Sequence, residues 1–445
     1  MRPTAFCVCG IVALSGLSSV AGRPTDGCSS VSSCVLLSTD YPTVSLAIAA
    51  CADKGGGRVT VPAGTYETGP VHLKSNVELH FEEGAKLVFT DNPKAYLPGV
   101  PSSWNGNECI NYSPLIYAYG CTNAAVTGKG VLAPRLGIWH VWRDAPGVIE
   151  TYQTLKVWSD GDVPLDARDL TAVPNSRGRP QTVQLYRCKN VTLDGFSIRG
   201  TPFWTVHLLR SNDIIVRNLD INAWAEDGTV LNNSDGIDIE MSKDVLVENC
   251  TFAQNDDAIV IKAGRGRDGR RIGTPSERIL IRNCTVNKGH VLLGIGSEVS
   301  GGIRDVRMEN CRVNCEVWRL FLVKTHPSRG GFVKNITVDG IEAKKVTHDA
   351  IRIHTRSFLG QPGGCEVPGP RPYLTDISDI AIRNVHCDWV KRFVQLLGDP
   401  DFPVRNVTLE NVVTDVAFED FVKVENVDGI KLDVTAKKVY PDAHW

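Results

Sequence analysis

The feature that most constrains this chain is a short pattern of apolar residues that returns along most of its length. Each copy reads apolar, any residue, apolar, then two or three residues, then apolar, any residue, apolar. The first apolar residues of most neighbouring copies lie about 23 to 34 positions apart, and those copies start at Val191, Ile214, Val245, Ile279, Val306, Ile336, Ile380, Val407 and Ile430. Alternation with a period of two indicates strands with one buried face, and a repeat of this length indicates a solenoid.

A single coil of such a repeat cannot bury its apolar face, whereas stacked coils share one continuous core. The pattern therefore predicts an all-β fold, a single-chain right-handed parallel β-helix of about ten coils, with the handedness taken from the rule for parallel crossovers. Residues 44–54 have the apolar spacing of a helix, which Gly55 to Gly57 would end. We expect this short helix to cap the N-terminal end. The last copy ends near Val434, and the tail to Trp445 is expected to cover the other end.

Composition narrows the possible functions. The chain of 445 residues has a formal net charge of -2, which argues against a general nucleic-acid-binding surface. Charged residues make up 22%, with 41 Gly and only 3 Met, and this balance suits a turn-rich β protein. Beyond the first residues, no stretch is long and apolar enough to span a bilayer. We expect one domain over residues 22–445, a monomer without a nucleic-acid or membrane partner.

Residues 1–21 read as a secretory signal peptide, with Arg2 at the start, an uncharged segment and small residues before a cut after Ala21. This predicts a secreted, extracellular protein. Twelve cysteines then remain, an even number that is compatible with disulfide bonds in an oxidising compartment. Neighbouring candidates for pairs are Cys109 with Cys121, Cys311 with Cys315, and Cys365 with Cys387. Cys250 and Cys284 occupy the same position of the repeat, which favours small buried residues stacked in the core.

Glycosylation sequons occur at seven positions, and several of them fall at the turn of the repeat, where Asn and Thr are needed for structure. The number of sequons therefore overstates the glycosylation that we expect. The seven are Asn111, Asn190, Asn232, Asn249, Asn283, Asn335 and Asn406.

Two stretches interrupt the repeat. Residues 135–180 form an inserted region with Trp139, Trp142 and Trp158, and residues 92–110 form a second irregular stretch. Long ordered loops on a rigid scaffold often shape a binding site. The alternative is that they only pack against the flank of the β-helix, and the sequence favours neither interpretation.

Three carboxylates and an imidazole lie about one repeat apart. Asp235 is followed after 21 positions by Asp256, and Asp257 is followed after 33 positions by His290. Residues one period apart lie above one another in a stacked coil, where neighbouring strands are about 4.8 Å apart. Paired carboxylates on one rigid face are what acid/base cleavage of a glycosidic bond requires. Adjacent residues of a strand point to opposite faces, so Asp256 and Asp257 both reach that face only if the backbone bends there.

The motifs around these residues resemble family 28 of the glycoside hydrolases, the polygalacturonase family, over roughly residues 40–440. The matching strings, in the family's order, are Asn232-Asn233-Ser234-Asp235-Gly236, Asn255-Asp256-Asp257, Gly289-His290 and Gly296-Ser297-Glu298. The Arg-rich loop 265–271 and the Ser-Glu-x-Ser-Gly-Gly string look most like the exo-acting branch. Where the family usually has Gly after the histidine, this chain has Val291, and where it usually has Arg two residues before the Lys, this chain has Leu322.

The resemblance implies a secreted hydrolase that cleaves α-1,4-linked galacturonic acid in pectin by inversion, most typical of chain-end (exo) action. By this resemblance Asp256 is the general acid, Asp235 and Asp257 activate the attacking water, and His290 tunes or relays protons to the acid. Lys324 would hold a substrate carboxylate. Crowding of the carboxylates should raise the pKa of one of them, which then acts as an acid.

Further residues are expected to bind substrate. A pectic chain is a polyanion, and a positively charged cleft would attract it. We expect Asn233, Lys262 and Arg271 to contribute, whereas a solvated charged loop explains at least Arg265 and Arg267. Trp204 would either stack on a sugar ring or belong to the core.

Other functions are compatible with the same sequence. One alternative is a rhamnogalacturonan hydrolase of the same family. Leu322 favours it, because the arginine that is missing here normally binds an acidic sugar. A non-catalytic carbohydrate-binding β-helix and a lyase on the same fold are further alternatives. We expect pectic polysaccharide as the partner, with no cofactor and no metal.

Overall fold

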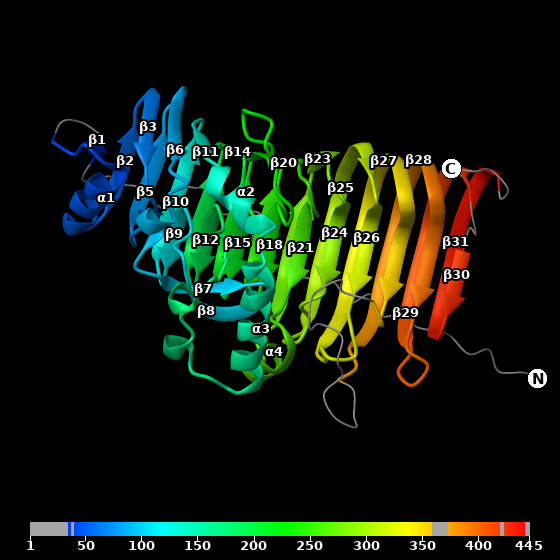
Figure 1. The fold of residues 1–445 in the computed structure, drawn as a ribbon. Coiled ribbons are helices and arrows are strands. Elements are labelled where there is room, and N and C mark those ends of the chain that lie inside the picture. Colours follow the sequence, from blue (N-terminus) through cyan, green and yellow to red (C-terminus); the bar gives the residue numbers. More distant parts are fainter. Residues whose placement is uncertain (1–33, 37–39, 358–372, 419–421, 441–445) are drawn as a thin grey trace, which may run out of the picture.

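The computed structural model describes residues 34–36, 40–357, 373–418 and 422–440. It is an elongated right-handed parallel β-helix, as the repeat predicts (Figure 1). Successive coils pair in parallel along three ladders that run the length of the molecule. The proposed signal peptide, residues 1–21, lies outside the described residues. Among those that are described, no helix has both the length and the apolar character that a membrane span requires.

One ladder, here the site ladder, carries the proposed functional residues. Its eleven successive strands agree with the expected coil number of about ten. They are β4 (Val71–His72), β9 (Ile116–Tyr119), β12 (Val183–Tyr186), β15 (Val206–Leu209), β18 (Ile237–Glu240), β21 (Ile259–Lys262), β24 (Val291–Gly296), β26 (Arg319–Lys324), β27 (Phe332–His354), β28 (Asp376–Leu397) and β30 (Val422–Glu425).

The other two ladders complete each coil, and from β25 (Ile303–Val317) onward single long strands belong to more than one ladder. The second ladder starts with β2 (Gly57–Val61), which pairs with β1 (Cys34–Leu36), and continues through β5 (Val77–Phe81), β10 (Thr122–Gly128), β13 (Lys189–Asp194), β16 (Asn212–Arg217), β19 (Lys243–Glu248) and β22 (Ser276–Arg282). The third contains β3 (Gly64–Thr68), β6 (Ala85–Phe89), β11 (Val131–Pro134), β14 (Ser197–Arg199), β17 (Asp220–Asn222), β20 (Thr251–Ala253) and β23 (Thr285–Lys288). Both end in β29 (Val404–Ala417) and β31 (Val427–Val439).

Alternate residues of each strand form the core. Ile237 pairs with Ile259, and Ile239 pairs with Ile261, and all four side chains are fully buried. The residues between them point outward, so each ladder presents a second row of side chains on its outer face. On the site ladder, this outer row is where a substrate would lie.

The asparagines of the turns serve the structure. Asn190, Asn249, Asn335 and Asn406 all have positive φ, between 54° and 55°, a left-handed conformation that Asn tolerates well. Their side-chain amides donate to an Asn or Asp of the preceding coil, as Asn335 does to Asp305 at 2.6 Å. These sequons therefore have a structural explanation, as predicted for the repeat turns.

Two of the three candidate disulfide bonds are absent from the described residues, which corrects these two expectations. Cys109 and Cys121 are both buried without a bond between them, and Cys311 and Cys315 are also free. Cys365 lies outside the described residues, so its pairing with Cys387 stays a prediction. The stacked interpretation is confirmed for Cys250 and Cys284, which are both 1% exposed. A free cysteine packs like a small apolar residue, which suits an inward position of the repeat.

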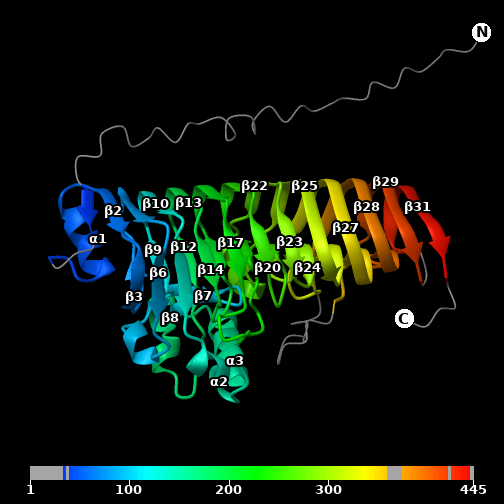
Figure 2. The same cartoon turned by 90° about the horizontal axis from the view of Figure 1, so that it is seen from above.

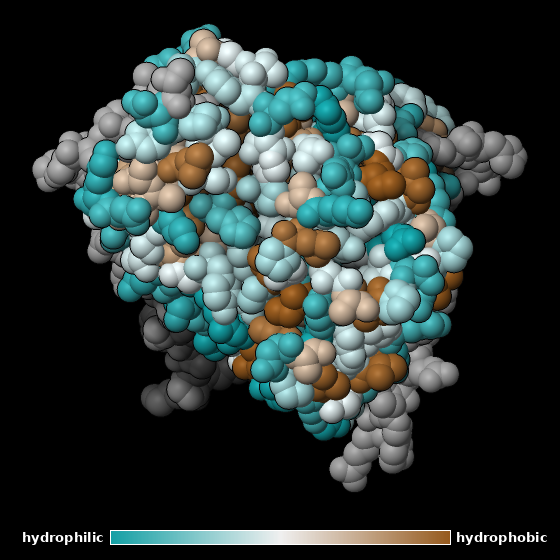
Figure 3. Space-filling view, turned by 60° about the vertical axis from the view of Figure 1, so that its left-hand side comes forward, coloured by the Kyte–Doolittle hydropathy of each residue, from teal (hydrophilic) through white to brown (hydrophobic). Residues whose placement is uncertain are grey.

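The N-terminal end is capped by α1 (Val44–Asp53), as predicted (Figure 1). The Thr43 side chain accepts a hydrogen bond from the backbone N–H of Leu46, and Val44, Ala47 and Ile48 are buried against the first coil. Viewed from this side, apolar residues form separate patches among polar ones (Figure 3).

At the opposite end, the last strand, β31, continues to Val439, five residues beyond the predicted end of the repeat. Of the tail that is expected to cover this end, residues 441–445 lie outside the described residues.

The interruptions of the repeat form a compact layer on one side of the β-helix. Residues 92–110 contain η3 (Pro93–Tyr96) and an antiparallel hairpin, β7 (Val100–Trp104) and β8 (Asn107–Asn111). Residues 135–180 contain α2 (Gly137–Arg143), α3 (Gly147–Asp160), η4 (Leu165–Ala167) and η5 (Leu170–Ala172). Figures 1 and 2 both show these helices and the hairpin projecting from the same side, in the N-terminal half.

Candidate active site

The backbone bends where the two adjacent aspartates occur. Residues 254–258 lie between β20 and β21 and have no strand conformation. Ala258 and Ile259 are both buried in the core, which breaks the strict alternation of a strand and allows Asp256 and Asp257 to lie on the same side. The Asp256 carboxylate accepts a hydrogen bond from the backbone N–H of Asp257 at 3.0 Å, which stabilises the bend.

The bend brings the predicted carboxylates and the histidine together. Side-chain oxygens of Asp256 and Asp257 and a ring nitrogen of His290 all lie within 4.8 Å of one another. His290 Nδ1 is 3.7 Å from Asp256 Oδ1, and Lys324 Nζ is 3.2 Å from Asp257 Oδ2. Such a group also has the spacing of metal ligands, but the Lys324 ammonium already occupies Asp257 and disfavours a cation there.

Asp235 completes the group from the coil before. Its side chain is 4% exposed, and one carboxylate oxygen has no hydrogen-bond partner. Burial, together with the negative charges of Asp256 and Asp238, raises the pKa of Asp235 well above its usual range. This carboxyl group therefore keeps its proton where an exposed aspartate is ionised.

Asp256 is more accessible and is electrostatically different. Its side chain is 24% exposed. Burial acts to raise its pKa, but the nearby His290 ring and the charge of Lys324 outweigh burial, so the pKa of Asp256 is lowered. As expected, the pKa of one carboxyl group is raised, and that group is Asp235. Asp256, which is expected to donate the proton, is instead kept ionised by His290 and Lys324.

A glycine makes room for the Asp257 carboxylate. Gly294 lies on the outer row of β24, and a Cβ at this position would lie 3.1 Å from Asp257 Oδ2. In the adjacent strand it pairs with Leu322. A glycine at 294 therefore lets Asp257 lie flat against the outer face, where Lys324 reaches it.

His290 is held by stacking. The indole ring of Trp318 lies parallel to the imidazole, with 3.6 Å between ring centroids and an interplanar angle of 6°. Trp318 is 43% exposed, and its backbone N–H donates to the carbonyl of His290 at 2.7 Å. The sequence analysis did not identify Trp318, which lies at the turn between β25 and β26. Val291, which replaces the usual glycine, is accommodated in a buried position.

Two predicted ligand residues are buried. Lys262 is 5% exposed, and its Nζ pairs with Glu298 Oε2 at 3.1 Å and lies 3.7 Å from Asp238 Oδ1. Trp204 is 2% exposed, and its ring lies 4.6 Å from Lys262 Nζ, in a small second core with Trp104 and Phe203. The Trp204 ring is thus core, and the Lys262 ammonium is already neutralised by protein carboxylates.

Asn233 is positioned by an arginine that the sequence analysis missed. The Arg179 guanidinium is fully buried and donates to Asn232 Oδ1 at 3.0 Å and to Asn233 Oδ1 at 3.3 Å. It also donates to the carbonyl of Pro202 at 2.8 Å. Because Arg179 comes from the inserted region, the insertion orders the segment that leads into Asp235.

Arg271 lies away from the carboxylates. It belongs to α4 (Gly266–Ile272), its side chain is 54% exposed, and it donates to Asp268 at 3.0 Å. It lines a separate pocket with Arg187, Arg210 and Glu108. Asp268 forms a buried ion pair with Arg168 of the insertion, so the Arg-rich loop is anchored as part of the structure.

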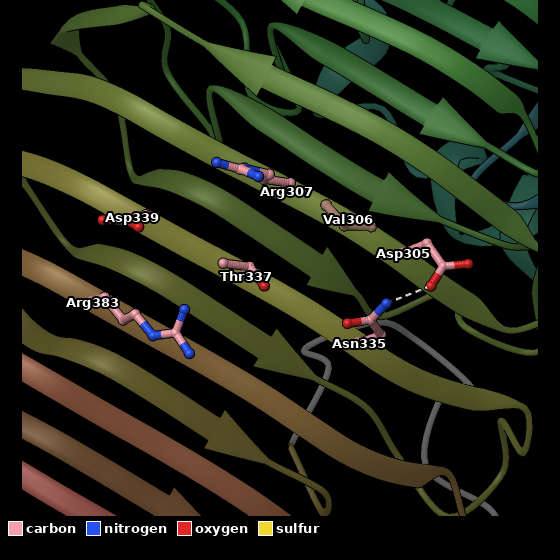
Figure 4. A pocket seen from close by; sticks show the side chains of 7 residues that line it. All are labelled: Asp305, Val306, Arg307, Asn335, Thr337, Asp339 and Arg383. Carbon is pink, nitrogen blue, oxygen red and sulfur yellow. Dashed lines mark hydrogen bonds between the residues drawn. The ribbon is translucent and has the colours of Figure 1, made fainter. Parts of the chain in front are cut away.

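A second groove lies on another face of the molecule (Figure 4). It is lined by residues of β25, β27 and β28, among them Arg307, Thr337 and Arg383. None of the predicted site residues line it. The carboxylates and His290 therefore remain the candidate active site.

The β-helix and this group of side chains together define a glycoside hydrolase, the class in which carboxyl groups on a rigid face cleave the bond between two sugars. Comparison with known families agrees. The chain belongs to the glycosyl hydrolases family 28, because the family model matches residues 51–436. The resemblance stated from the motifs is confirmed.

Three individual relatives share between 25% and 33% sequence identity with this chain. A crystal structure of a hyperthermoactive exopolygalacturonase from Thermotoga maritima is similar, with 33% identity and a TM-score of 0.80, covering 91% of each chain. A probable polygalacturonase from Vitis vinifera is 25% identical over 82% of this chain and 68% of its own length. An endo-polygalacturonase from Pectobacterium parmentieri is 25% identical over 86% of each chain. The relatives thus include both exo-acting and endo-acting enzymes.

Proposed function

We propose that this enzyme cleaves α-1,4-linked galacturonic acid in pectin, with inversion and from the end of the chain. The family supports the substrate class, and the carboxylate group supports acid/base chemistry. Lys324, the ammonium beside the carboxylates, supports recognition of an acidic sugar. In this proposal Asp256 donates the proton to the leaving oxygen, while Asp235 and Asp257 activate the attacking water.

Substrate binding itself supplies a reason for proton transfer to Asp256. Without substrate, the positive charge of Lys324 helps to keep the pKa of Asp256 low. A substrate carboxylate paired with Lys324 would cancel much of that attraction and add a negative charge nearby. The pKa of Asp256 would then rise, and the proton held by the coupled carboxyl groups would move to the residue that contacts the leaving group.

The observation that carries exo action is the hairpin that covers one side of the site ladder. The β7–β8 hairpin lies on the outer faces of β9 and β12, where Tyr117 donates to the carbonyl of Pro101 and Ser102 Oγ donates to Gln184 Oε1 at 3.0 Å. One coil, that of β15, lies between them and the coils of Asp235 and Asp257. A polysaccharide that occupies the carboxylates therefore meets a wall on the N-terminal side.

The wall is rigid and reaches the site. At the hairpin turn, Gly106 accepts a hydrogen bond from the backbone N–H of Arg265 at 3.0 Å, and a Cβ at Gly106 would lie 2.5 Å from the Glu298 side chain. Behind it, the Trp104 ring packs between Phe203 and Tyr152 of α3. A substrate path that is blocked on one side by the hairpin would admit a chain end and exclude a continuous chain.

Product analysis on a defined oligogalacturonide tests this proposal. Release of galacturonic acid alone, with each oligomer shortened by one unit, is the expected result, and the first product should have the inverted anomeric configuration. A mixture of oligomers at early times would refute exo action. Rhamnogalacturonan hydrolysis is the second candidate because of Leu322, and activity on rhamnogalacturonan without activity on galacturonan would establish it.

The proposal includes export. The predicted signal peptide supports a secreted, extracellular enzyme that acts on the plant cell wall, and we propose that it acts as a monomer. N-terminal sequencing of the protein recovered from culture medium tests the export, with a mature chain that starts after Ala21 as the expected result.

A further inference from the structure

Arginines on the next coil lie beside the position where this chain lacks the usual arginine. Leu322 faces outward between two buried residues, and in the parallel pairing of β26 with β27 it lies opposite Arg352. In the same pairing Lys324 lies opposite His354. Neighbouring coils are about 4.8 Å apart, so Arg352 lies one strand step further from the wall than Leu322.

Arg352 belongs to a cluster of three arginines around one carboxylate. Asp349 is fully buried, and it accepts a hydrogen bond from Arg352 Nη1 at 2.7 Å. Arg319 Nη2 lies 3.5 Å from the same carboxylate, and Arg392 Nε lies 2.7 Å from its other oxygen. Three guanidinium groups face one negative charge, so the cluster keeps a positive surplus.

The guanidinium of Arg352 is held in place from two sides. Besides its contact with Asp349, Arg352 Nη2 donates to His354 Nδ1 at 3.1 Å. Burial and the nearby charge of Arg352 lower the pKa of His354, which keeps its ring neutral and able to accept. A guanidinium has more N–H donors than these two contacts use, and the Arg352 side chain is 21% exposed.

The cluster adjoins the catalytic group. The charge of Asp257 acts on Arg319, which lies on the same strand as Lys324. Arg329, five positions after Lys324 in the sequence, is 3% exposed and donates to the carbonyl of Ser297 at 3.0 Å. Arg329 therefore supports the backbone near Glu298, whereas Arg352 remains on the outer face.

We propose that Arg352, oriented by Asp349 and His354 and supported by Arg319 and Arg392, is the receptor for the carboxylate of the sugar unit that extends from the cleaved bond away from the wall. The proposal rests on the proposed function, since it names the substrate group that this part of the site recognises. A planar guanidinium binds a carboxylate through two parallel hydrogen bonds, which an ammonium does not offer. In that case Leu322 does not indicate that the enzyme binds a neutral sugar at this position, because Arg352 of the neighbouring coil supplies the arginine.

Binding measured without turnover tests the receptor. Trigalacturonate and its fully methyl-esterified counterpart are titrated calorimetrically into D256N and into D256N/R352Q. We expect R352Q to weaken trigalacturonate binding by about 10- to 100-fold, the loss typical of a charge-assisted hydrogen-bonded contact, and to leave binding of the ester unchanged. R383Q is the matched control, an arginine of the same β-helix in the groove of Figure 4, and should change neither.

Two further variants keep the test decisive. R352K retains a positive charge beside Asp349 but loses the planar fork, and should lose part of the affinity. L322R in the R352Q background should restore part of it. If R352Q does not fold, as judged by circular dichroism, R352K alone decides the question.

Trigalacturonate binding by folded R352Q and R352K within about twofold of the parent would overturn the receptor. So would an equal loss for the ester, or no trigalacturonate binding by D256N at all. Release of galacturonic acid by the wild-type enzyme is measured separately and decides the proposed function independently of this result.

Discussion

Replacing Lys262 by methionine should destabilise the fold without removing a substrate contact. The Lys262 ammonium is 3.1 Å from Glu298 Oε2, and both side chains are buried. Burial opposes ionisation of Glu298, but Lys262, Arg265 and Arg329 outweigh it and lower its pKa from 4.5 to about 2. At about 1.4 kcal/mol per pKa unit, this shift corresponds to about 3 kcal/mol of stabilisation at neutral pH.

The sign of the pH dependence follows from the lowered pKa. Between about pH 2 and pH 4.5, Glu298 is ionised in the folded state but largely protonated in the unfolded chain. The stabilisation is therefore fully present above pH 4.5 and is lost as the pH falls towards about 2. In Lys262→Met, Glu298 lacks its main partner, so this part of the acid dependence should largely disappear.

Urea unfolding followed by circular dichroism at pH 7 measures the effect. Lys262→Met should lose about 3 kcal/mol, in the range found when one partner of a buried pair is removed. The double variant Lys262→Met/Glu298→Gln should recover most of that loss, because no unpaired buried charge remains. Its KM for oligogalacturonide should stay close to the wild-type value.

Two results would refute this reasoning. One is a double variant that is no more stable than Lys262→Met, which would mean that the unpaired carboxylate is not the cause of the loss. The other is a large rise in KM for a double variant of normal stability, which would make Lys262 a substrate ligand as the sequence suggested.

Further predictions concern the site. Asp256→Asn should retain the circular dichroism spectrum of the wild type and lose about 10²- to 10⁴-fold in kcat, as expected for a general acid; unchanged hydrolysis would point to a different acid. Trp318→Ala should lower kcat about 3- to 10-fold, because His290 loses its stacking partner, whereas Trp318→Phe should keep most of the activity. Treatment with a chelator should leave activity unchanged, since Lys324 already occupies the Asp257 carboxylate; a loss that is reversed by added metal would contradict this.

Much of the fold was predictable because it depends on a local pattern. Alternation of apolar residues identifies the strands, and their period identifies the stacked coils. The capping helix follows from the apolar spacing of residues 44–54, although the structure shows that Val44, Ala47 and Ile48 are among the residues it buries. The hairpin of residues 100–111 was missed, although the dipeptide Asn105-Gly106 is a strong signal for a two-residue hairpin turn. The hairpin lies outside the repeat, so the sequence does not indicate which strands it packs against. Its position on the site ladder was therefore not predictable.

The roles of single polar residues were harder to predict. A lysine in a charged loop reads as a substrate ligand, but Lys262 is buried because Glu298, 36 positions further on, lies next to it in the fold. Two of the three disulfide expectations failed for a similar reason. An even number of cysteines says nothing about which face of a strand each one occupies.

For this protein the sequence by itself determined the β-helix, its family and the residues that gather at the catalytic group, because a repeat places equivalent positions above one another. Only the tertiary structure decided which carboxyl group keeps its proton, which lysine is open to substrate, and that an arginine on the next coil stands beside Leu322. Those properties depend on burial and on charges brought close from distant parts of the chain, and electrostatic interactions respond to distance in space rather than to separation in sequence.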